Sequence, residues 1–280
     1  MSTPLVVFHR GALGDSVMLW PWLRAAAARR PAVTLVTDRE KAALAASVLG
    51  IHGADAERRE FNALWREGAE ITPTAPVGEV IAFHRSGVWE HNALRMFPEA
   101  ALRAIDARAT RPLIDQLTRE EGGPVPLPRV DHPGGPLVVH VGAGSPAKSW
   151  PIDRWPGVVA SLRTRAINAP WRFIAGEVEA ERFTRDDRAA FDTLGGRYLA
   201  TLDDLRRAIT PARAFAGNDS GPTHLAAQLG VPTLAIFGPT DPTLWAPCGP
   251  AVRVLAAGGP IDGLGGDGVA RALTELLAIG

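Results

Sequence analysis

The sequence predicts an α/β protein built from two parallel-sheet domains. Short apolar runs alternate with helical patterns, which is typical of buried parallel strands joined by crossover helices. The alternation begins at Leu5 and begins again at Leu137, and a stretch at 122–136 that is dense in glycine and proline separates the two halves. With 280 residues, 46% of them hydrophobic, the chain can bury two such cores. We therefore expect two Rossmann-like domains that bind ligands at the carboxyl ends of their strands.

The N-terminal domain is expected to span residues 1–130. Its predicted elements are a strand at Leu5–Phe8, a helix from Ser16 that ends before Pro31, a strand at Val33–Thr37, a helix at Arg39–Leu49 and a strand at Gly78–Phe83. The stretch at 54–76 shows no clear pattern.

The C-terminal domain is expected to span residues 137–280. Its predicted elements are strands at Leu137–Val141, Trp171–Ala175, Thr233–Phe237 and Val252–Leu255, and helices at Asp153–Arg165, across Glu177–Asp192 and at Asp267–Ile279. The closing helix at 267–279 could pack back on the N-terminal domain.

The stretch from Ala216 to Pro250 is the most informative part of the chain. Asp219 and Ser220 suit the N-cap of a short helix, and Gly230 suits its left-handed C-terminus. A helix N-terminus beside the end of a buried strand binds anions such as a diphosphate, because free backbone N–H groups and the helix dipole point there. The candidate contacts are Asp219, Ser220, Gly221, Thr223 and His224.

This stretch also carries a family resemblance. Residues 218–232 read NDSGPTHLAAQLGVP and residues 237–242 read FGPTDP. The pattern resembles the C-terminal signature of glycosyltransferase family 9, which contains the ADP-heptose:lipopolysaccharide heptosyltransferases. With Leu5–Pro31 and Leu137–Pro156, the resemblance covers about a third of the chain.

The resemblance implies GT-B architecture, in which two Rossmann-like domains face across a cleft that can close. It implies an inverting, metal-independent glycosyltransferase without a cofactor. The nucleotide-sugar donor, with ADP-heptose favoured, would bind the C-terminal domain, and the acceptor would be a lipopolysaccharide core or a related glycan. A transferase that uses another nucleotide sugar, and a nucleotide-binding protein of GT-B type without transfer activity, remain alternatives.

The turn after the first predicted strand contains Gly14 and Asp15. It lacks the dinucleotide fingerprint, since Leu13 and Ser16 occupy two of the three glycine positions, and this disfavours a nicotinamide-dependent oxidoreductase. A carboxylate at a strand–helix junction could accept a proton from an attacking hydroxyl. In the family this Asp is regarded as the catalytic base. The alternative is that Asp15 caps its helix.

The loop at 142–149 nearly spells a phosphate-binding Walker A sequence. Ala147 stands where the second glycine belongs, and Pro151 follows where the helix should begin, which argues against a nucleotide triphosphatase. The segment resembles instead the family's Lys-x-Trp-Pro motif. Lys148, with Ser145 nearby, would then pair with the donor diphosphate and offset the charge that builds on the leaving group. The alternative is a surface lysine.

Other candidates are less specific. The resemblance places a Glu near the donor nucleoside, and Glu177 follows the strand at 171–175, although Glu179 or Glu181 could take that role. His224 could contact phosphate or be a core histidine. We do not interpret His9, His84 or His140 as ligands, and no spacing of His or Asp residues indicates a metal site.

Composition limits which kinds of partner and which cellular location we expect for the protein. The formal net charge is zero, so nothing in it indicates nucleic acid. The single cysteine excludes an internal disulfide, and no apolar run resembles a signal peptide or a membrane span. We expect a cytoplasmic protein, and peripheral contact with the inner membrane is not excluded. Seven basic residues cluster in the first 59 positions, and they either lie on solvated helix faces or form a surface that meets an anionic acceptor. They are Arg24, Arg29, Arg30, Arg39, Lys41, Arg58 and Arg59.

The segment at 80–95 follows the family only loosely. His84 and Arg85 stand where a Gln-Gly pair is more usual. This segment would help to meet the acceptor, so the identity of the acceptor stays open.

Overall fold

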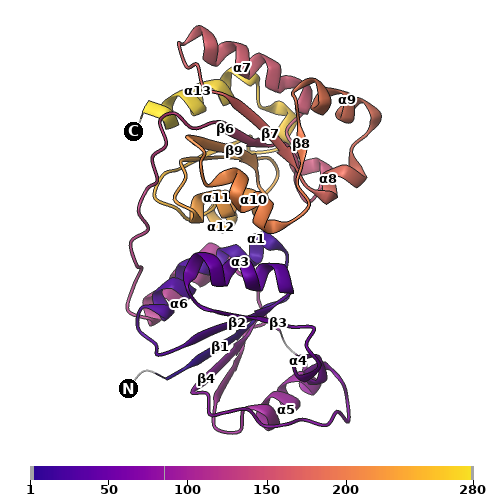
Figure 1. Cartoon of the computed structure of the whole chain (residues 1–280), viewed down its shortest axis with the longest axis vertical. Coiled ribbons are helices and arrows are strands. Elements are labelled where there is room, and N and C mark those ends of the chain that lie inside the picture. The colour runs from indigo at the N-terminus through magenta and orange to yellow at the C-terminus, as the bar shows by residue number, and fades with distance from the viewer. Residues whose placement is uncertain (1–2, 85, 279–280) are drawn as a thin grey trace. The chain divides into compact units, whose positions relative to one another are not determined.

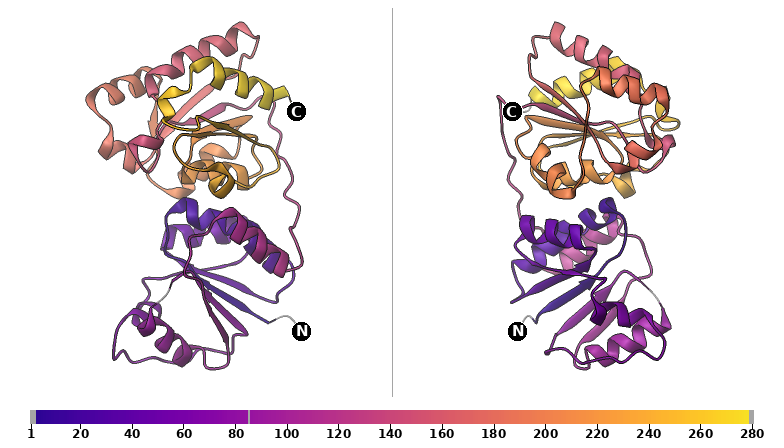
Figure 2. Two further views of the ribbon diagram at one scale, coloured as in Figure 1. Left: turned by 180° about the vertical axis from the view of Figure 1, so that it is seen from behind. Right: turned by 45° about the vertical axis from the view of Figure 1, so that its right-hand side comes forward.

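A computed structural model describes residues 3–84 and 86–278. The chain divides into two compact units, Met1–Val125 and Pro126–Gly280, with the boundary inside the stretch that is rich in glycine and proline. Each unit is a parallel β-sheet with helices on both faces (Figures 1 and 2). Each is therefore a Rossmann-like α/β unit, as the alternating sequence pattern predicts.

The N-terminal sheet has the strand order β3-β2-β1-β4-β5. Its elements are β1 (Leu5–Phe8), α1 (Leu13–Met18), α2 (Trp20–Ala27), β2 (Val33–Thr37), α3 (Arg39–Leu49), β3 (His52–Asp55), α4 (Arg59–Asn62), η1 (Ala63–Trp65), β4 (Glu79–Ala82), α5 (Gly87–Met96), β5 (Ala101–Ala104) and α6 (Arg111–Glu120). All four residues of the central strand β1 are buried. The order of strands reverses between β1 and β4, and such a switch point is where open α/β sheets bind ligands.

The C-terminal sheet has the strand order β11-β10-β9-β6-β7-β8. Its elements are β6 (Leu137–His140), η2 (Pro146–Lys148), η3 (Ile152–Arg154), α7 (Trp155–Thr164), β7 (Trp171–Ala175), α8 (Glu177–Arg182), α9 (Arg185–Thr193), β8 (Arg197–Tyr198), α10 (Leu202–Ile209), β9 (Ala214–Asn218), α11 (Gly221–Gln228), β10 (Thr233–Phe237), α12 (Pro242–Trp245), β11 (Val252–Ala256), η4 (Ile261–Gly263) and α13 (Gly266–Ala278). Here the switch point lies between β6 and β9, so the loops after these two strands are the expected ligand site.

Two predicted helices are each divided in the structure. The first begins at Leu13 rather than Ser16 and is interrupted at Leu19, because Pro21 in the first turn of α2 cannot donate to the preceding turn. The predicted helix across 177–192 is α8 and α9. Thr184 separates them, since its hydroxyl accepts the N–H of Asp187 as the N-cap of α9.

The closing helix α13 buries its apolar face in its own unit. Val269, Leu273 and Leu276 belong to the core that also contains Trp155 and Val158 of α7. The face that we considered for packing on the N-terminal domain is thus used within the C-terminal unit, and Ile279 lies outside the described residues. In the part of the chain that the structure describes, no helix is long and apolar enough to cross a membrane.

Candidate functional site

Asp15 lies in the first turn of α1, at the switch point of the N-terminal sheet. It does not cap the helix, because the N-cap is Ala12, which makes no side-chain capping bond. Among residues 3–84 and 86–278, no hydrogen bond or ion pair engages the Asp15 carboxylate. The capping alternative is therefore wrong for this residue, and its carboxylate is available for a ligand. Gly14 precedes it within the same helix.

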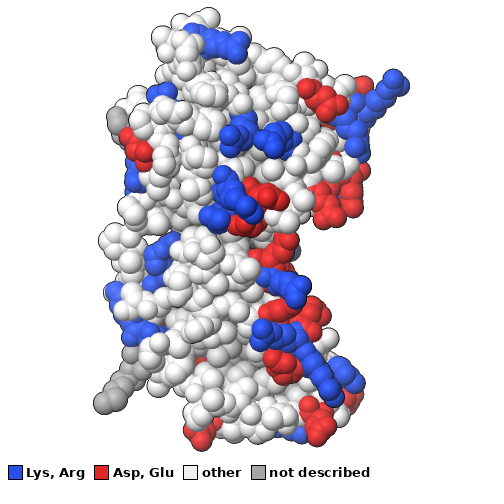
Figure 3. All heavy atoms as spheres, in the orientation of Figure 1, with Lys and Arg blue, Asp and Glu red and all other residues white. Residues whose placement is uncertain are grey.

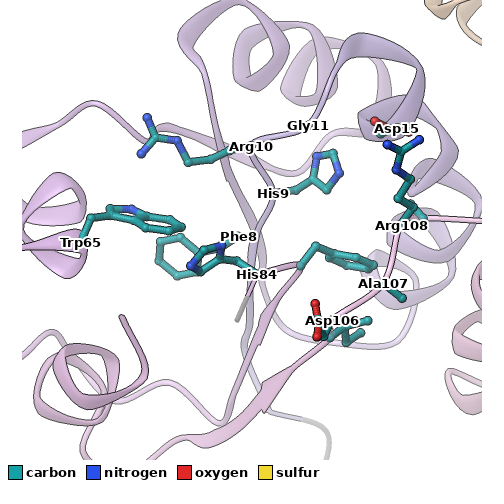
Figure 4. Close-up of a pocket in the computed structure, with 13 residues that line it drawn as sticks. Phe8, His9, Arg10, Gly11, Asp15, Trp65, His84, Asp106, Ala107 and Arg108 are labelled. Carbon is teal, nitrogen blue, oxygen red and sulfur yellow. The ribbon is translucent and has the colours of Figure 1, made fainter. Parts of the chain in front are cut away.

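A pocket of about 590 Å³ opens beside Asp15 (Figure 4). Segments that follow β1, β4 and β5 surround it, together with Trp65 of η1. Its lining residues are Phe8, His9, Arg10, Gly11, Asp15, Trp65, Phe83, His84, Ile105, Asp106, Ala107, Arg108 and Ala109. Aromatic faces, two arginines and two carboxylates in one cavity suit a polar, hydroxyl-rich ligand.

His84 forms part of one wall of this pocket. Its ring meets Trp65 edge to face at 4.1 Å between centroids, and the Arg10 guanidinium lies 5.4 Å from the centre of the Trp65 ring. Burial, and secondarily the charge of Arg10, lowers the pKa of His84, so its imidazole is neutral at pH 7. The sequence analysis did not assign His84 a ligand role, and Arg85 lies outside the described residues.

The early basic residues do not form one open surface. Arg30 pairs with Glu79 and Glu121, and Lys41 pairs with Asp38, all within the N-terminal unit. On the face of the molecule shown in Figure 3, basic and acidic side chains are interspersed. Arg39 and Arg58 also lie 4.0 Å from Asp55 and 3.9 Å from Glu60, so four of the seven basic residues have an acidic neighbour within the unit.

In the C-terminal unit, three side chains meet at the switch point. Lys148 Nζ lies 2.7 Å from Asp219 Oδ2, and the Thr240 hydroxyl donates to the same oxygen at 2.7 Å. The Asp219 side chain is 7% exposed, whereas that of Lys148 is 32% exposed. A buried carboxylate thus fixes a partly exposed ammonium at the N-terminal end of α11.

Asn218, the first residue of the 218–232 motif, holds the fold together rather than facing a ligand. Its Oδ1 accepts the Trp150 N–H at 3.0 Å, and its amide nitrogen donates to the carbonyl oxygens of Val141 and Gly142. The Thr223 hydroxyl in turn donates to the Asn218 carbonyl at 2.6 Å. Asn218 and Thr223 therefore tie the Lys148 loop to β9 and α11, a role that the sequence did not reveal.

Three further predicted contacts lie at the starts of η2 and α11: Ser145, Ser220 and Gly221. Ser145 is the N-cap of η2, and its carbonyl accepts the N–H of Lys148. Ser220 is the N-cap of α11 but makes no side-chain capping bond, and its hydroxyl donates to Asn218. Pro222 has no N–H and the Thr223 N–H donates to the Ser220 carbonyl at 3.1 Å, so in the described part of the chain the Gly221 N–H is the first-turn amide of α11 that can serve an anion.

His224 is buried one turn into α11. Its Nε2 lies 4.0 Å from Asp219 Oδ1, and its Nδ1 has no hydrogen-bond partner in the described part of the chain. Burial lowers the pKa of His224 to about 4; Asp219 opposes this effect and Lys148 adds to it. His224 is neutral at pH 7, so any contact with phosphate would be a neutral hydrogen bond.

Two buried histidines make stability depend on pH. The folded-state pKa values of His9 and His224 are both about 4, against an ordinary value of 6.5. The unfolded chain therefore binds more protons between these values, and the free energy of unfolding falls as pH decreases from 6.5 to about 4. We expect a slope of at most about 1.4 kcal/mol per pH unit for each histidine.

Urea unfolding at pH 7.5, 6 and 5 measures this slope, and His224→Gln should flatten it. An equal slope in the wild type and the variant would show that His224 does not titrate as described.

Glu177 and Glu179 have different environments. Glu177 begins α8 and is exposed, where it could reach ribose hydroxyls. Glu179 is buried, accepts the N–H of Gly176 at 2.9 Å, and lies 3.6 Å from His140 Nε2. Glu179 is thus committed to the fold, whereas Glu177 and Glu181 are both exposed carboxylates.

Because Gly142 has no side chain, the buried Glu179 carboxylate can pack directly against its backbone. A Cβ at Gly142 would lie 2.0 Å from Glu179 Oε1, whereas a Cβ at Gly144 would meet nothing within 4 Å. We expect Gly142→Ala to lower the free energy of unfolding by about 1–3 kcal/mol through overpacking. Gly144→Ala is the matched control and should change it little. The urea concentration at the midpoint of unfolding measures both effects, and equal midpoints for the two variants would contradict this packing.

Within residues 3–84 and 86–278, no group of three His, Cys, Asp or Glu side chains could hold a metal ion.

The chain was compared with known proteins. The family model described as glycosyltransferase family 9 (heptosyltransferase) matches residues 41–259. Lipopolysaccharide heptosyltransferase 1 of Pseudomonas aeruginosa is 32% identical over 113 residues, which cover 39% of this chain and 31% of the relative. The Salmonella typhimurium protein of the same name is 31% identical over 100 residues, which cover 35% of this chain and 30% of the relative. The matched segment thus spans less than a third of either relative.

Solved structures match over almost the whole chain. E. coli heptosyltransferase WaaC with ADP superposes with a TM-score of 0.71 at 18% identity, covering 98% of this chain and 99% of that one. E. coli ADP-heptose lps heptosyltransferase II gives 0.67 at 17% identity, covering 100% and 99%. These likenesses confirm the expected GT-B architecture.

Proposed function

Because this chain belongs to glycosyltransferase family 9, we propose that it is an inverting transferase that moves a heptosyl group from ADP-heptose to a glycan hydroxyl. A lipopolysaccharide core or a related glycan is the proposed acceptor. The observation that carries the proposal is the ammonium of Lys148, which Asp219 holds at the N-terminus of α11 while the Thr240 hydroxyl donates to the same Asp219 oxygen. A fixed cation beside the free Gly221 N–H at a helix N-terminus suits a diphosphate that must leave with its charge stabilised.

In this proposal the donor diphosphate lies between Lys148 and the first turn of α11. Lys148 and the Gly221 N–H take its oxygens, and the hydroxyls of Ser145 and Ser220 are assigned further contacts with it. Asp219 would repel a phosphate oxygen, so we assign it the task of positioning Lys148 rather than binding the donor. Glu177 receives the ribose hydroxyls.

The transfer step needs one base and one stabilised leaving group. The acceptor hydroxyl oxygen attacks the anomeric carbon, and the bond from that carbon to the diphosphate oxygen breaks. The electron pair of the broken bond leaves with ADP, whose charge Lys148 offsets, while the hydroxyl proton passes to the Asp15 carboxylate. Attack opposite the leaving group inverts the anomeric configuration. Cytoplasmic location, with the acceptor at the inner membrane, is part of the same proposal.

A nucleotide screen tests the donor half of the proposal. We expect ADP to raise the melting temperature of the wild type more than UDP, GDP or NAD at equal concentration, because ligand binding to the native state stabilises it. Stabilisation by NAD alone would overturn the proposal. Stabilisation by ADP without transfer to any lipopolysaccharide-core acceptor would favour a nucleotide-binding protein instead.

A further inference from the structure

His9 occupies the space that Gly11 leaves beside Asp15. A Cβ at Gly11 would lie 2.6 Å from His9 Cε1, 2.9 Å from His9 Nε2 and 3.1 Å from the Cβ of Asp15. The imidazole edge and the Asp15 side chain therefore share the same small volume above Gly11. Figure 4 shows the His9 ring directed into the pocket, toward Asp15 and Arg108.

Among the described residues, the imidazole of His9 has no hydrogen-bond partner. The residue is buried, and its Nδ1 is a buried atom with no hydrogen-bond partner in the described ranges. No hydrogen bond of Nε2 is found there either. A ring contact with Phe83 at 5.6 Å between centroids holds the side chain in place. The buried Nδ1 is out of reach of a ligand, whereas Nε2 borders the space at Gly11 beside Asp15, so Nε2 is the atom that a ligand in the pocket can engage.

Burial keeps this imidazole neutral at pH 7. Burial, and secondarily the Lys41 ammonium, lowers the pKa of His9 to about 4, while Asp38 opposes the shift. Lys41 donates to the Gly11 carbonyl and pairs with Asp38, so the cation is fixed beside the turn. Asp15 and Arg108 face the ring from the pocket. A neutral imidazole offers one donor and one acceptor and does not compete with Asp15 for the proton.

We propose that His9 is a second group that contacts the acceptor: its imidazole hydrogen-bonds an acceptor oxygen and turns the attacking hydroxyl toward Asp15. This inference rests on the proposed glycosyltransferase function. His9 neither gains nor loses a proton in the step, since the hydroxyl proton passes to Asp15. The role is orientation of a bound hydroxyl, which a side chain of similar hydrogen-bonding capacity can replace.

Two variants of one position test the proposal. His9→Leu removes the hydrogen bond at similar volume, whereas His9→Gln keeps a donor and an acceptor. We expect His9→Leu to lower kcat/KM for the acceptor roughly 10- to 100-fold, with ADP affinity unchanged, and His9→Gln to stay within about fivefold of wild type. Transfer by His9→Leu within about twofold of wild type, or equal losses in both variants, would overturn it.

A second measurement does not depend on turnover. In protein labelled with ¹⁵N-histidine, the His9 ring should be neutral at pH 7, and a deacylated lipopolysaccharide-core oligosaccharide should shift its ¹⁵N resonances. Unchanged resonances at saturating oligosaccharide would overturn the role of His9. If the wild type transfers no sugar, the proposed function fails, and the same spectra still decide whether His9 contacts the glycan.

Discussion

Asp15→Asn should lower the rate of sugar transfer by roughly 10²–10⁴-fold, with ADP affinity nearly unchanged. Asn has almost the size of Asp but cannot accept the hydroxyl proton. The structure removes the competing explanation, because Asp15 is not the N-cap of α1 and has no partner among the described residues. The variant should therefore fold normally while losing the chemical step. Transfer kinetics and calorimetric ADP titration measure the two quantities.

Asp267→Asn is the matched control. Asp267 is also a first-turn carboxylate, in α13, and it is exposed. Both changes remove one favourable charge from a helix N-terminus, worth about 0.3–1 kcal/mol of stability. Similar small changes in melting temperature, with transfer lost only in Asp15→Asn, are expected. Normal transfer by Asp15→Asn would mean that another group is the base.

Lys148→Ala should weaken ADP binding and slow transfer together. Loss of one electrostatic contact with the leaving group costs on the order of 2–4 kcal/mol in the transition state. The variant should also lose stability, because Asp219 then keeps a buried charge whose Oδ2, among the described residues, accepts a hydrogen bond from the Thr240 hydroxyl alone. ADP titration, transfer kinetics and the melting temperature report these effects.

A double variant separates the two effects of Lys148. Lys148→Ala with Asp219→Asn removes the unpaired charge and should recover much of the lost stability, but neither ADP affinity nor transfer. Asp219→Asn alone should leave the ammonium less firmly placed and give a smaller loss of transfer. If Lys148→Ala transfers within about twofold of wild type while folded, Lys148 does not stabilise the leaving group.

Most buried strands could be predicted from the sequence, although the central strand β9 was missed; of the edge strands, β11 was predicted and β3, β5 and β8 were not. Val33–Thr37, Trp171–Ala175 and Thr233–Phe237 have the predicted bounds, because a parallel strand buried on both faces reads as a continuous apolar run. The strand β3 (sequence HGAD) and the two-residue strand β8 carry no such run. Their pairing partners hold them in place, and this tertiary effect is invisible in a local pattern.

In the candidate site, too, some residues could be predicted from the sequence and others only from the fold. Sequence motifs indicated Asp15, Lys148 and the start of α11, because these lie in short turns at strand ends whose residues match the motifs of the family. The pairing of Lys148 with Asp219 joins residues 71 positions apart, so only the fold reveals it. His9 was set aside as a scattered histidine, since its burial, its missing partners and its place beside Gly11 are three-dimensional facts.

The central claim is transfer of a heptosyl group with inversion, and one measurement addresses it. ADP-heptose and a lipopolysaccharide-core acceptor are incubated with the wild type, and NMR compares the anomeric configuration of the product with that of the donor. The account predicts one ADP released for each sugar transferred and an anomeric configuration opposite to that of the donor. Retained configuration, or ADP binding without any glycan product, would contradict it.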